Sequence, residues 1–414
     1  MNFFVLSSVS RPFPQPKLIP QSTDLSSEGN TMKPTIRKLA GIAIALSLGA
    51  HASAADLKVG FVTALSGPGS SIGIPYAKGI QAALAYKAEM SGRKIQLIQL
   101  DDASDPSTAA RNARKLVEEE KVDVLIGTSG VPGSMAIAAA ARESKTPMLA
   151  ITPMTLAGDD SAWTVTTAQP VSLMISAVVE AMKRSGIKTV GYVGFSDSWG
   201  DLVYDGLQKS AEPAGIKVLT NERYARSDSS VAGQVLKMVA TRPDAVMTGG
   251  SGTPGALPYL ALTERGYRGP IYGTHALINA DFVRVAGASA EGLLAPTGPV
   301  VVAEQLPDSH PSKKIALDFR AAYQRANGAP TTDAFSAYAF DAWLVLADAA
   351  ARVSPKLEPG SAAYRAALRD AIFSTKELAV THGVLNFKPG SPYGADERSR
   401  VIVKLTKGQW ILQP

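Results

Sequence analysis

From Leu57 to about Ala295, short apolar runs alternate with amphipathic stretches long enough for helices. Apolar runs bounded by turn residues are typical of buried strands, and strands that alternate with helices form parallel sheets covered by helices. The pattern therefore predicts an α/β fold. Strands are expected at 57–63, 94–100, 123–127, 147–151, 188–194, 216–220, 244–248, 270–273 and 292–295. Helices are expected at 74–90, 106–119, 134–144, 171–185, 199–214, 230–241, 255–266 and 279–286.

An internal repeat indicates that this α/β pattern is split into two lobes. The segments 115–133 and 237–255 each contain a helix end, an Asp, a short apolar strand and the sequence Ser-Gly-x-Pro-Gly. A chain of 414 residues is long enough for two domains, since single cores stop growing near ~250–300 residues. Two α/β lobes with matching halves would produce this repeat. A chance similarity of two strand–helix units remains the alternative.

The Ser-Gly-x-Pro-Gly loops follow strands, and in open α/β sheets ligands gather at the carboxyl ends of strands. If two lobes face one another, these loops face each other across a cleft. After about Val300 the pattern changes to a Pro-rich segment followed by helices near 311–327, 333–352 and 361–374 and short strands near 384–387 and 400–405. The helix near 333–352 is very apolar, but Asp341 and Asp348 interrupt it, which favours a core helix over a membrane span.

The N-terminal region predicts export. Starting at Met32, a basic stretch precedes an apolar run from Leu39 to Gly49, and Ala52-Ser53-Ala54 forms an A-x-A cleavage signal. The apolar run is too short to span a bilayer comfortably, so a signal peptide over 32–54, cleaved after Ala54, is favoured over a membrane anchor. Residues 1–31 are interpreted as a mis-annotated or disordered extension.

Cysteine content and charge narrow the function further. The chain contains no cysteine, so there is neither a disulfide nor a lipid-modified cysteine to anchor it. The net charge is +6, and residues 1–54 carry five Lys/Arg and two Asp/Glu, so the mature chain is near +3. This charge is too small to argue for nucleic-acid or membrane binding.

The loop 66–73, "SGPGSSIG", raises the possibility of a nucleotide site. Its third glycine comes one residue late for the dinucleotide pattern G-x-G-x-x-G, and the Gly-Lys-Ser/Thr end of a phosphate loop is missing. A plain strand-to-helix turn is the alternative, although the loop can still offer backbone N–H groups to an anion. We therefore expect no nucleotide or other cofactor.

A search for catalytic residues finds little. The histidines are His51, His275, His310 and His382, the sequence contains no H-E-x-x-H, and the segments "GTSGV" and "GGSGT" lack the closing glycine of a G-x-S-x-G motif. We expect no catalytic residues and no metal site. A Ser–His pair assembled from distant segments is left open, so a secreted α/β hydrolase remains an alternative to a binding protein.

Several segments together resemble one family. They are "KVGFVTALSGPGSSIG", "LDDASDPSTAARNARKLVEEEKVDVLIG", "PMLAITPMT", "VGFSDSWGDLVYDGL", "AEGLLAPTGP" and "FDAWLVLADAA". In this order, from about Asp56 to the end, the chain resembles the leucine/isoleucine/valine-binding family of periplasmic receptors that feed ABC importers.

The resemblance implies two Rossmann-like lobes, the type I periplasmic binding protein fold, joined by three hinge crossings around a ligand cleft. Lobe 1 is expected at 55–169 and 303–381, and lobe 2 at 170–302 and 382–414. The implied partners are a small carboxylate ligand and an inner-membrane ABC permease with its ATPase subunits. The implied form is a periplasmic monomer that binds no nucleic acid.

The resemblance also implies ligand-binding positions. The first ligand loop maps to 67–73, with Ile72 against the ligand. The residues that meet the ligand carboxylate map to Ser134 and the backbone N–H of Gly133, with Ser129 as the alternative serine. The remaining positions map to Met154, Thr155, Trp199, Ser251 and Gly252.

One position departs from the family pattern. Amino-acid receptors of this family place an acidic residue after the "GPIYG" strand to hold the ammonium group, and here that position is His275. A histidine cannot pair with a cation, but it can bind a hydroxyl or a second anionic group. By resemblance, an aromatic or related organic acid fits better than an amino acid. A structural role for His275, with a branched-chain amino acid or an amide as the ligand, remains the alternative.

Overall fold

The strands between residues 57 and 166 form a six-stranded sheet. In the computed structural model, which describes residues 55–156, 158–331 and 333–414, its order is β2-β3-β1-β4-β5-β6. Neighbouring strands are parallel except for β2, which forms an antiparallel hairpin with β3. The strands are β1 Leu57–Thr63, β2 Glu89–Met90, β3 Arg93–Asp101, β4 Val124–Gly127, β5 Met148–Ala150 and β6 Thr164–Thr166.

A second sheet has the order β16-β15-β12-β11-β10-β7-β8, and β9 also pairs with β7. Strands β7 to β12 are parallel, and the C-terminal β15 and β16 add antiparallel to the edge at β12. The strands are β7 Thr189–Phe195, β8 Lys217–Val218, β9 Glu222–Tyr224, β10 Ala245–Gly249, β11 Ile271–Tyr272, β12 Leu294–Thr297, β15 Val401–Thr406 and β16 Gln409–Gln413. A separate hairpin joins β13 Leu378–Val380 and β14 Gly383–Leu385.

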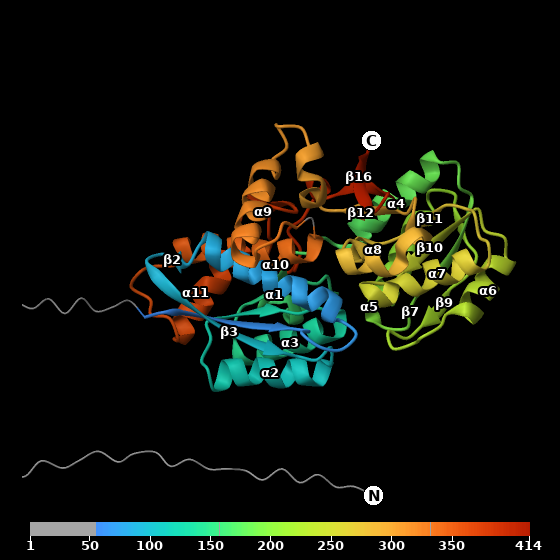
Figure 1. The fold of residues 1–414 in the computed structure, drawn as a ribbon. Coiled ribbons are helices and arrows are strands. Elements are labelled where there is room, and N and C mark those ends of the chain that lie inside the picture. Colours follow the sequence, from blue (N-terminus) through green and yellow to red (C-terminus); the bar gives the residue numbers. More distant parts are fainter. Residues whose placement is uncertain (1–54, 157, 332) are drawn as a thin grey trace, which may run out of the picture. The chain divides into compact units, whose positions relative to one another are not determined.

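Each sheet and its helices form one lobe (Figure 1). We call the first sheet with α1–α3 and α9–α11 lobe 1, and the second sheet with α4–α8 lobe 2. The lobe 1 helices are α1 Ser70–Tyr86, α2 Pro106–Glu118, α3 Val131–Ser144, α9 Lys313–Asn327, α10 Ala334–Arg352 and α11 Ala362–Phe373. The lobe 2 helices are α4 Val171–Arg184, α5 Ser198–Ala211, α6 Ala232–Ala240, α7 Leu257–Glu264 and α8 Ala280–Ala286. Short 3-10 helices lie at Gly158–Ser161, Thr253–Ala256, His275–Leu277, Gly287–Ala290, Pro299–Gln305 and Glu397–Ser399.

Three segments pass between the lobes. The first crossing is 167–170, between β6 and α4; the second is 298–312, between β12 and α9; the third is 386–400, between β14 and β15. The type I periplasmic binding protein architecture expected from the sequence is therefore confirmed, whereas the residue-exact lobe boundaries remain predictions. The predicted signal peptide and the extension before it lie outside the described residues.

Most predicted elements lie where the periodicity placed them, and α1 shows why one did not. The helix was expected to begin at residue 74, but it begins at Ser70, directly after the glycine loop. Its N-cap is Gly69, which has no side chain to mark the start in the sequence. It ends at Tyr86 because the chain then turns back at Ser91 and Gly92, which both have positive φ, into the β2–β3 hairpin. The sequence pattern contains no signal for either event.

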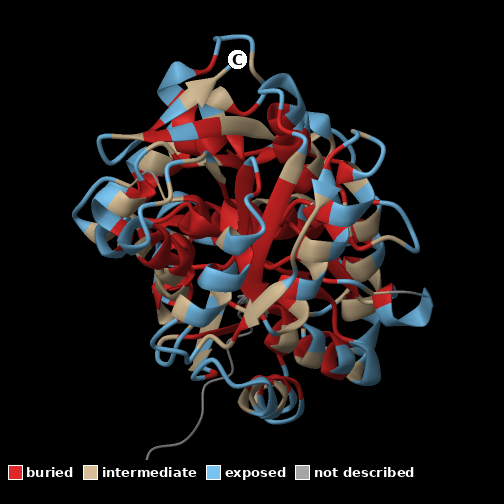
Figure 2. Cartoon of the chain, turned by 90° about the vertical axis from the view of Figure 1, so that its right-hand side faces the viewer, coloured by how far each residue is buried: buried red, intermediate tan, exposed pale blue. Residues whose placement is uncertain are grey.

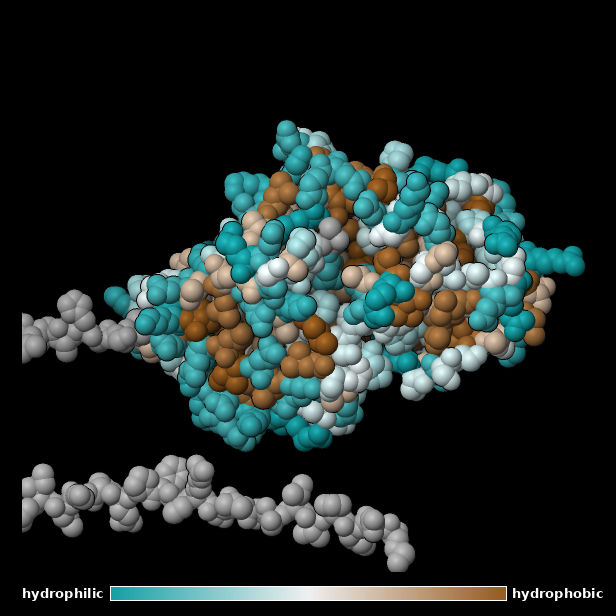
Figure 3. Space-filling view, viewed as in Figure 1, coloured by the Kyte–Doolittle hydropathy of each residue, from teal (hydrophilic) through white to brown (hydrophobic). Residues whose placement is uncertain are grey.

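The core follows the strands and the helix faces turned toward them (Figure 2). Among the described helices, α10 alone has the length and composition of a membrane span, but 83% of its apolar window is buried inside the protein. Helix α10 contacts α1, α11 and the β13 strand, so it is a core helix, as the two aspartates predicted. The face drawn in Figure 3 combines hydrophilic residues with groups of apolar residues, which gather at its lower left and on its right.

Candidate functional site

A cavity of about 30 Å³ lies where the carboxyl ends of both sets of strands converge, and both lobes line it. The two repeated loops contribute to it from opposite sides, Ser129 and Gly130 after β4 and Ser251 after β10. The lobe 1 lining is Ile72, Tyr76, Ser129, Gly130, Val131, Ile151, Thr152, Pro153, Phe335 and Tyr338, and the lobe 2 lining is Trp199, Arg226, Ser251, His275 and Ala276.

Four of the predicted site residues line this cavity: Ile72, Trp199, Ser251 and His275. Gly252 lies beside it at φ +55°, where a Cβ would press against Ser71 and Ile72 of the other lobe. This close approach lets the next amide, Thr253 N, donate to Ser71 Oγ at 3.1 Å. The lobes therefore touch at the rim of the cavity.

The predicted carboxylate ligands Gly133 and Ser134 do not reach this cavity. Ser134 is fully buried, and its Oγ accepts from Thr128 N at 3.3 Å and donates to Thr128 O at 3.4 Å. Ser129 does line the cavity, but its hydroxyl is already engaged. It accepts from Ala64 N at 3.1 Å, and it must donate to Thr63 Oγ1 at 3.1 Å because the Thr63 proton goes to a backbone carbonyl. Neither serine therefore has a proton free for a ligand in this arrangement.

Met154 and Thr155 also miss the cavity, because the chain reaches it two residues earlier, at Thr152 and Pro153. Met154 is fully buried, and its backbone exchanges two hydrogen bonds with the hydroxyl of Tyr393, in the third crossing, at 3.0 and 2.8 Å. Thr155 is exposed. The structure thus places neither Met154 nor Thr155 at this cavity, and their contact with a ligand stays a prediction.

Arg226 is a cavity residue that the sequence reasoning missed. Its Nε donates to Asp197 Oδ2 at 2.6 Å, its Nη1 donates to Ser251 Oγ at 2.8 Å, and its guanidinium lies 4.2 Å from the centre of the Phe195 ring. Within the described residues Nη2 has no hydrogen-bond partner. Asp197 is itself fixed, because it caps α5 through Trp199 N and Gly200 N. The guanidinium is therefore held by three contacts and retains a free donor.

His275 contributes a neutral imidazole to the cavity. It is 3% exposed, and neither ring nitrogen has a partner among the described residues. Burial, with a smaller contribution from His382, lowers the pKa of His275 to about 3. Its ring meets the edge of Trp199 at 5.5 Å, and the Trp199 Nε1 donates to Gly250 O at 3.3 Å. At neutral pH the imidazole thus offers one donor and one acceptor to whatever occupies the cavity.

Residues 56–384 match the sequence model of the periplasmic binding protein family. The chain belongs to this family. A solved extracellular ligand-binding receptor from Rhodopseudomonas palustris HaA2 is 40% identical, with a TM-score of 0.82 over 87% of this chain and 100% of that one. A curated relative from Brucella melitensis biotype 1, "Leu/Ile/Val-binding protein homolog 3", is 24% identical over 63% of this chain and 72% of its own length.

A third similar structure is a solute-binding protein of an ABC transporter from R. palustris, solved in complex with benzoate. It is 22% identical, with a TM-score of 0.71 over 86% of this chain and 95% of that one. At this identity the likeness shows the fold alone. Family and neighbours are substrate-binding receptors, so the chain is a substrate-binding receptor of the Leu/Ile/Val-binding family.

This periplasmic binding protein has an outer chamber next to its cavity. The chamber measures about 190 Å³ and shares Ser129, Gly130 and Arg226 with the cavity. It adds Asp102, whose pKa is raised by burial and whose Oδ2 accepts from Thr128 Oγ1 at 2.5 Å. Gly69 of the glycine loop and Gly133 also line it. Arg226 therefore lines both spaces.

The described part of this binding protein contains no cluster of three or more His, Asp or Glu side chains that could hold a metal ion. His310 and His382 do not line the cavity. His310 accepts from Ser312 N at 3.2 Å, and His382 pairs with Asp341 at 2.9 Å. The cavity lining also lacks an acidic side chain among the described residues. The chemistry that the lining offers is therefore a cation, a neutral imidazole and aromatic walls.

Proposed function

We propose that this protein is a periplasmic receptor of an ABC importer that captures a small carboxylate, an aromatic or related organic acid, between its lobes. The single observation that carries the proposal is Arg226, a fixed guanidinium with a free Nη2 at a cavity whose described lining has no acidic residue. A planar guanidinium binds carboxylates more strongly than any neutral donor.

The N-terminus of α3 supports the same charge from the opposite lobe. The helix begins at Val131, and Gly130 and Val131 both line the cavity. The first N–H groups of a helix lack intrahelical partners and carry partial positive charge, so they favour an anion. A carboxylate between α3 and Arg226 would be bound by both lobes at once, which favours closure around it.

His275 argues against an α-ammonium group. A buried cation without an acidic partner costs several kcal/mol, and His275 stands where the family pattern has its acidic residue. A neutral imidazole instead suits a hydroxyl or another uncharged polar group. Trp199, Tyr76, Phe335 and Tyr338 provide aromatic walls for a ring. The benzoate complex of a protein with the same fold agrees with this class of ligand.

The cavity volume limits how an aromatic acid can be bound. An apolar cavity of ~150 Å³ holds benzene, whereas the cavity here measures about 30 Å³. An aromatic acid must therefore extend into the outer chamber or enter when the lobes move apart. Both are compatible with walls that come from two lobes.

Export and delivery complete the proposal. The predicted signal peptide would place the mature chain in the periplasm, and an inner-membrane permease with its ATPase subunits would receive the ligand. We infer a monomer without a cofactor or a catalytic activity. The alternative within the family is a branched-chain amino-acid receptor, which the name of the Brucella relative favours.

Ligand retention tests the proposal. Purified mature protein is incubated with a pool of aromatic acids, aliphatic acids and amino acids, and the retained compound is identified by mass spectrometry. We expect an aromatic or related acid, recovered unchanged. Recovery of leucine or valine would support the amino-acid receptor, and recovery of a converted product would support a hydrolase.

A further inference from the structure

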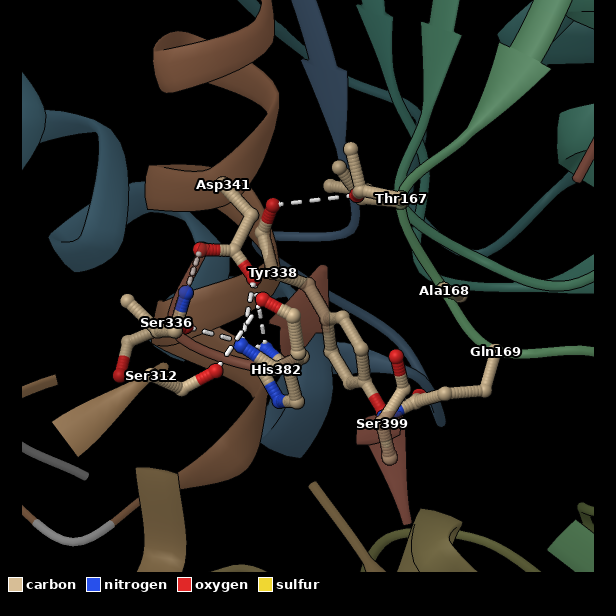
Figure 4. A network of polar contacts seen from close by, with 12 residues as sticks. Thr167, Ala168, Gln169, Ser312, Ser336, Tyr338, Asp341, His382 and Ser399 are labelled. Atoms are coloured by element: carbon tan, nitrogen blue, oxygen red, sulfur yellow. Dashed lines mark hydrogen bonds and ion pairs between the residues drawn. The ribbon is translucent and has the colours of Figure 1, made fainter. Parts of the chain in front are cut away.

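Polar contacts connect the cavity to the segments that join the lobes (Figure 4). Tyr338 of α10 lines the cavity, and its hydroxyl donates to Gln169 Oε1 of the first crossing at 2.5 Å. Gln169 Nε2 in turn donates to Ser399 O of the third crossing at 2.9 Å. Thr167 Oγ1, also in the first crossing, donates to the backbone carbonyl of Tyr338 at 3.3 Å. One tyrosine thus reaches two crossings.

The ring of Tyr338 reaches the second crossing through His382. The two rings stack at 3.7 Å with an interplanar angle of 6°. Asp341, one turn along α10, holds the imidazole at 2.9 Å through Nδ1 and also accepts from His382 N at 3.1 Å. The other side of the imidazole lies against Gly298, where a Cβ would overlap the ring. The stack is therefore confined between α10 and the second crossing.

The polar groups around the crossings are not all paired. Thr297 Oγ1, His382 Nε2 and Ser399 Oγ are buried and have no hydrogen-bond partner among the described residues. Buried polar atoms without partners cost free energy. A different arrangement of the crossings that pairs them would recover it. The junction thus has hydrogen-bonding capacity left for a second arrangement.

We propose that Tyr338 couples occupation of the cavity to the arrangement of the three crossings, with Gln169 as the relay. This inference rests on the proposed function, because it assumes that the ligand occupies this cavity. A ligand shifts a conformational equilibrium only through contacts that differ between the two states. Tyr338 is the cavity residue whose contacts extend to the crossings, so it is a positioning residue for closure, and Gln169 acts through it.

The structure also gives the direction of the effect. Here the lobes touch, with Thr253 N donating to Ser71 Oγ at 3.1 Å, and the Tyr338–Gln169 bond is formed. Removing that bond therefore destabilises the conformation in which the lobes are in contact relative to the conformation in which they are apart. The ligand must then supply the difference, and its apparent affinity falls.

Two variants break the link from either side, and a third serves as a control. Tyr338→Phe removes the hydroxyl and keeps the ring in the cavity. Gln169→Ala removes the relay and leaves the cavity lining intact. Tyr192→Phe is the matched control, because the buried Tyr192 does not line the cavity and its hydroxyl donates to Gly200 O, within lobe 2, at 2.9 Å.

The first measurement needs no ligand. The chain has no cysteine, so Glu118→Cys in α2 and Leu236→Cys in α6, both exposed, place one fluorophore on each lobe. Single-molecule energy transfer then gives the distribution of interlobe distances. We expect Tyr338→Phe and Gln169→Ala to shift the distribution toward longer distances to a similar extent, and Tyr192→Phe to leave it unchanged. Equal distributions for all four proteins would overturn the coupling.

The second measurement uses benzoate as the probe. We expect Tyr338→Phe and Gln169→Ala each to raise its Kd about five- to tenfold, the effect of one net hydrogen bond, and the double variant to resemble the single ones. Additive effects, or an equal effect of Tyr192→Phe, would overturn the coupling. If the wild-type protein fails to bind benzoate, the proposed ligand class fails, while the ligand-free distributions still decide the coupling.

Discussion

At the scale of single residues, the proposed ligand class rests on the charges of Arg226 and His275. Arg226 carries a positive charge fixed by Asp197 and Ser251, and His275 remains neutral because burial lowers its pKa to about 3. The pair therefore offers a partner for a carboxylate and none for an ammonium.

Replacing Arg226 tests this assignment. Arg226→Met should raise the Kd for an aromatic acid about 10- to 100-fold, since hydrogen bonds to charged groups contribute about 1.5–3 kcal/mol. Arg223→Met is the control. Arg223 lies three residues away and pairs with Asp201 at 3.1 Å, but it does not line the cavity. Calorimetry on the three proteins measures the effect. A similar loss in both variants, or no loss in Arg226→Met, would contradict the assignment.

The pKa of His275 predicts an acid-sensitive stability. The unfolded chain takes up a proton at this residue near pH 6.5, and the folded chain only near pH 3. The neutral His275 therefore causes no loss of stability at neutral pH, but the free energy of unfolding decreases as the pH falls from about 6.5 toward 3. At pH 4.5 the loss from this group is about 2–3 kcal/mol. Between pH 7 and pH 4.5, the free energy of unfolding measured in urea should therefore decrease by that much less in His275→Gln than in the wild type. If the two proteins lose the same free energy over this pH range, the assignment is refuted.

The sequence could locate His275 but not Arg226. His275 stands out because the family pattern expects an acidic residue there. Arg226 lies in a loop without any motif, and its role depends on a contact with Ser251, 25 positions away, that no sequence spacing reveals. The shift from Met154 and Thr155 to Thr152 and Pro153 has a similar cause, because a one- or two-residue error at a strand end moves the predicted contact out of the cavity.

At the scale of elements, α1 and α10 approach each other so closely at Gly79 that no side chain fits between them there. A Cβ on Gly79 of α1 would overlap the backbone carbonyl of Ser336 in α10. Both helices carry cavity residues, namely Ile72 and Tyr76 on α1 and Phe335 and Tyr338 on α10. Their separation therefore sets the width of the cavity on the lobe 1 side.

A glycine substitution tests this packing. Gly79→Ala should destabilise the protein by about 1–3 kcal/mol, because overpacking forces the helices apart. Gly233→Ala is the matched control: it also lies in a helix, nothing lies within 4 Å of its Cβ position, and alanine is favoured over glycine in a helix. Thermal or urea unfolding compares the two. Equal stability of the two variants would mean that the α1–α10 contact relaxes without cost.

Periodicity predicted most of the elements because their apolar positions repeat regularly, as in β1, where four of seven residues are apolar and buried. It missed β2, β6, β9, β13 and β16, which are short or lie in turn-rich sequence. Their pairing is decided by neighbouring strands and not by their own residues. Helix α2, in contrast, begins at a local signal, since the carboxylate of Asp105 accepts from Thr108 N at 2.7 Å and Pro106 follows it.

At the scale of the whole molecule, the site exists only where the lobes meet. The lining comes from both sheets, and the crossings carry the network that leads to Tyr338. A bound ligand should therefore change both the stability and the dimensions of the protein.

A ligand at about a hundred times its Kd should add about 2.7 kcal/mol to the free energy of unfolding. Small-angle scattering of the same sample should show a smaller radius of gyration than without ligand, because the ligand favours the closed state. Arg226→Met at the same ligand concentration is the control. Stabilisation without any compaction would argue against hinge closure and leave only binding.

The most direct test of the account is calorimetry on the wild-type protein and on His275→Glu, with benzoate-type acids and with leucine and valine. We expect the wild type to bind an aromatic acid more tightly than either amino acid. His275→Glu should weaken the acid, because a carboxylate repels an anion and pairs with an ammonium. Tighter binding of leucine or valine than of every aromatic acid by the wild type would contradict the account and identify an amino-acid receptor.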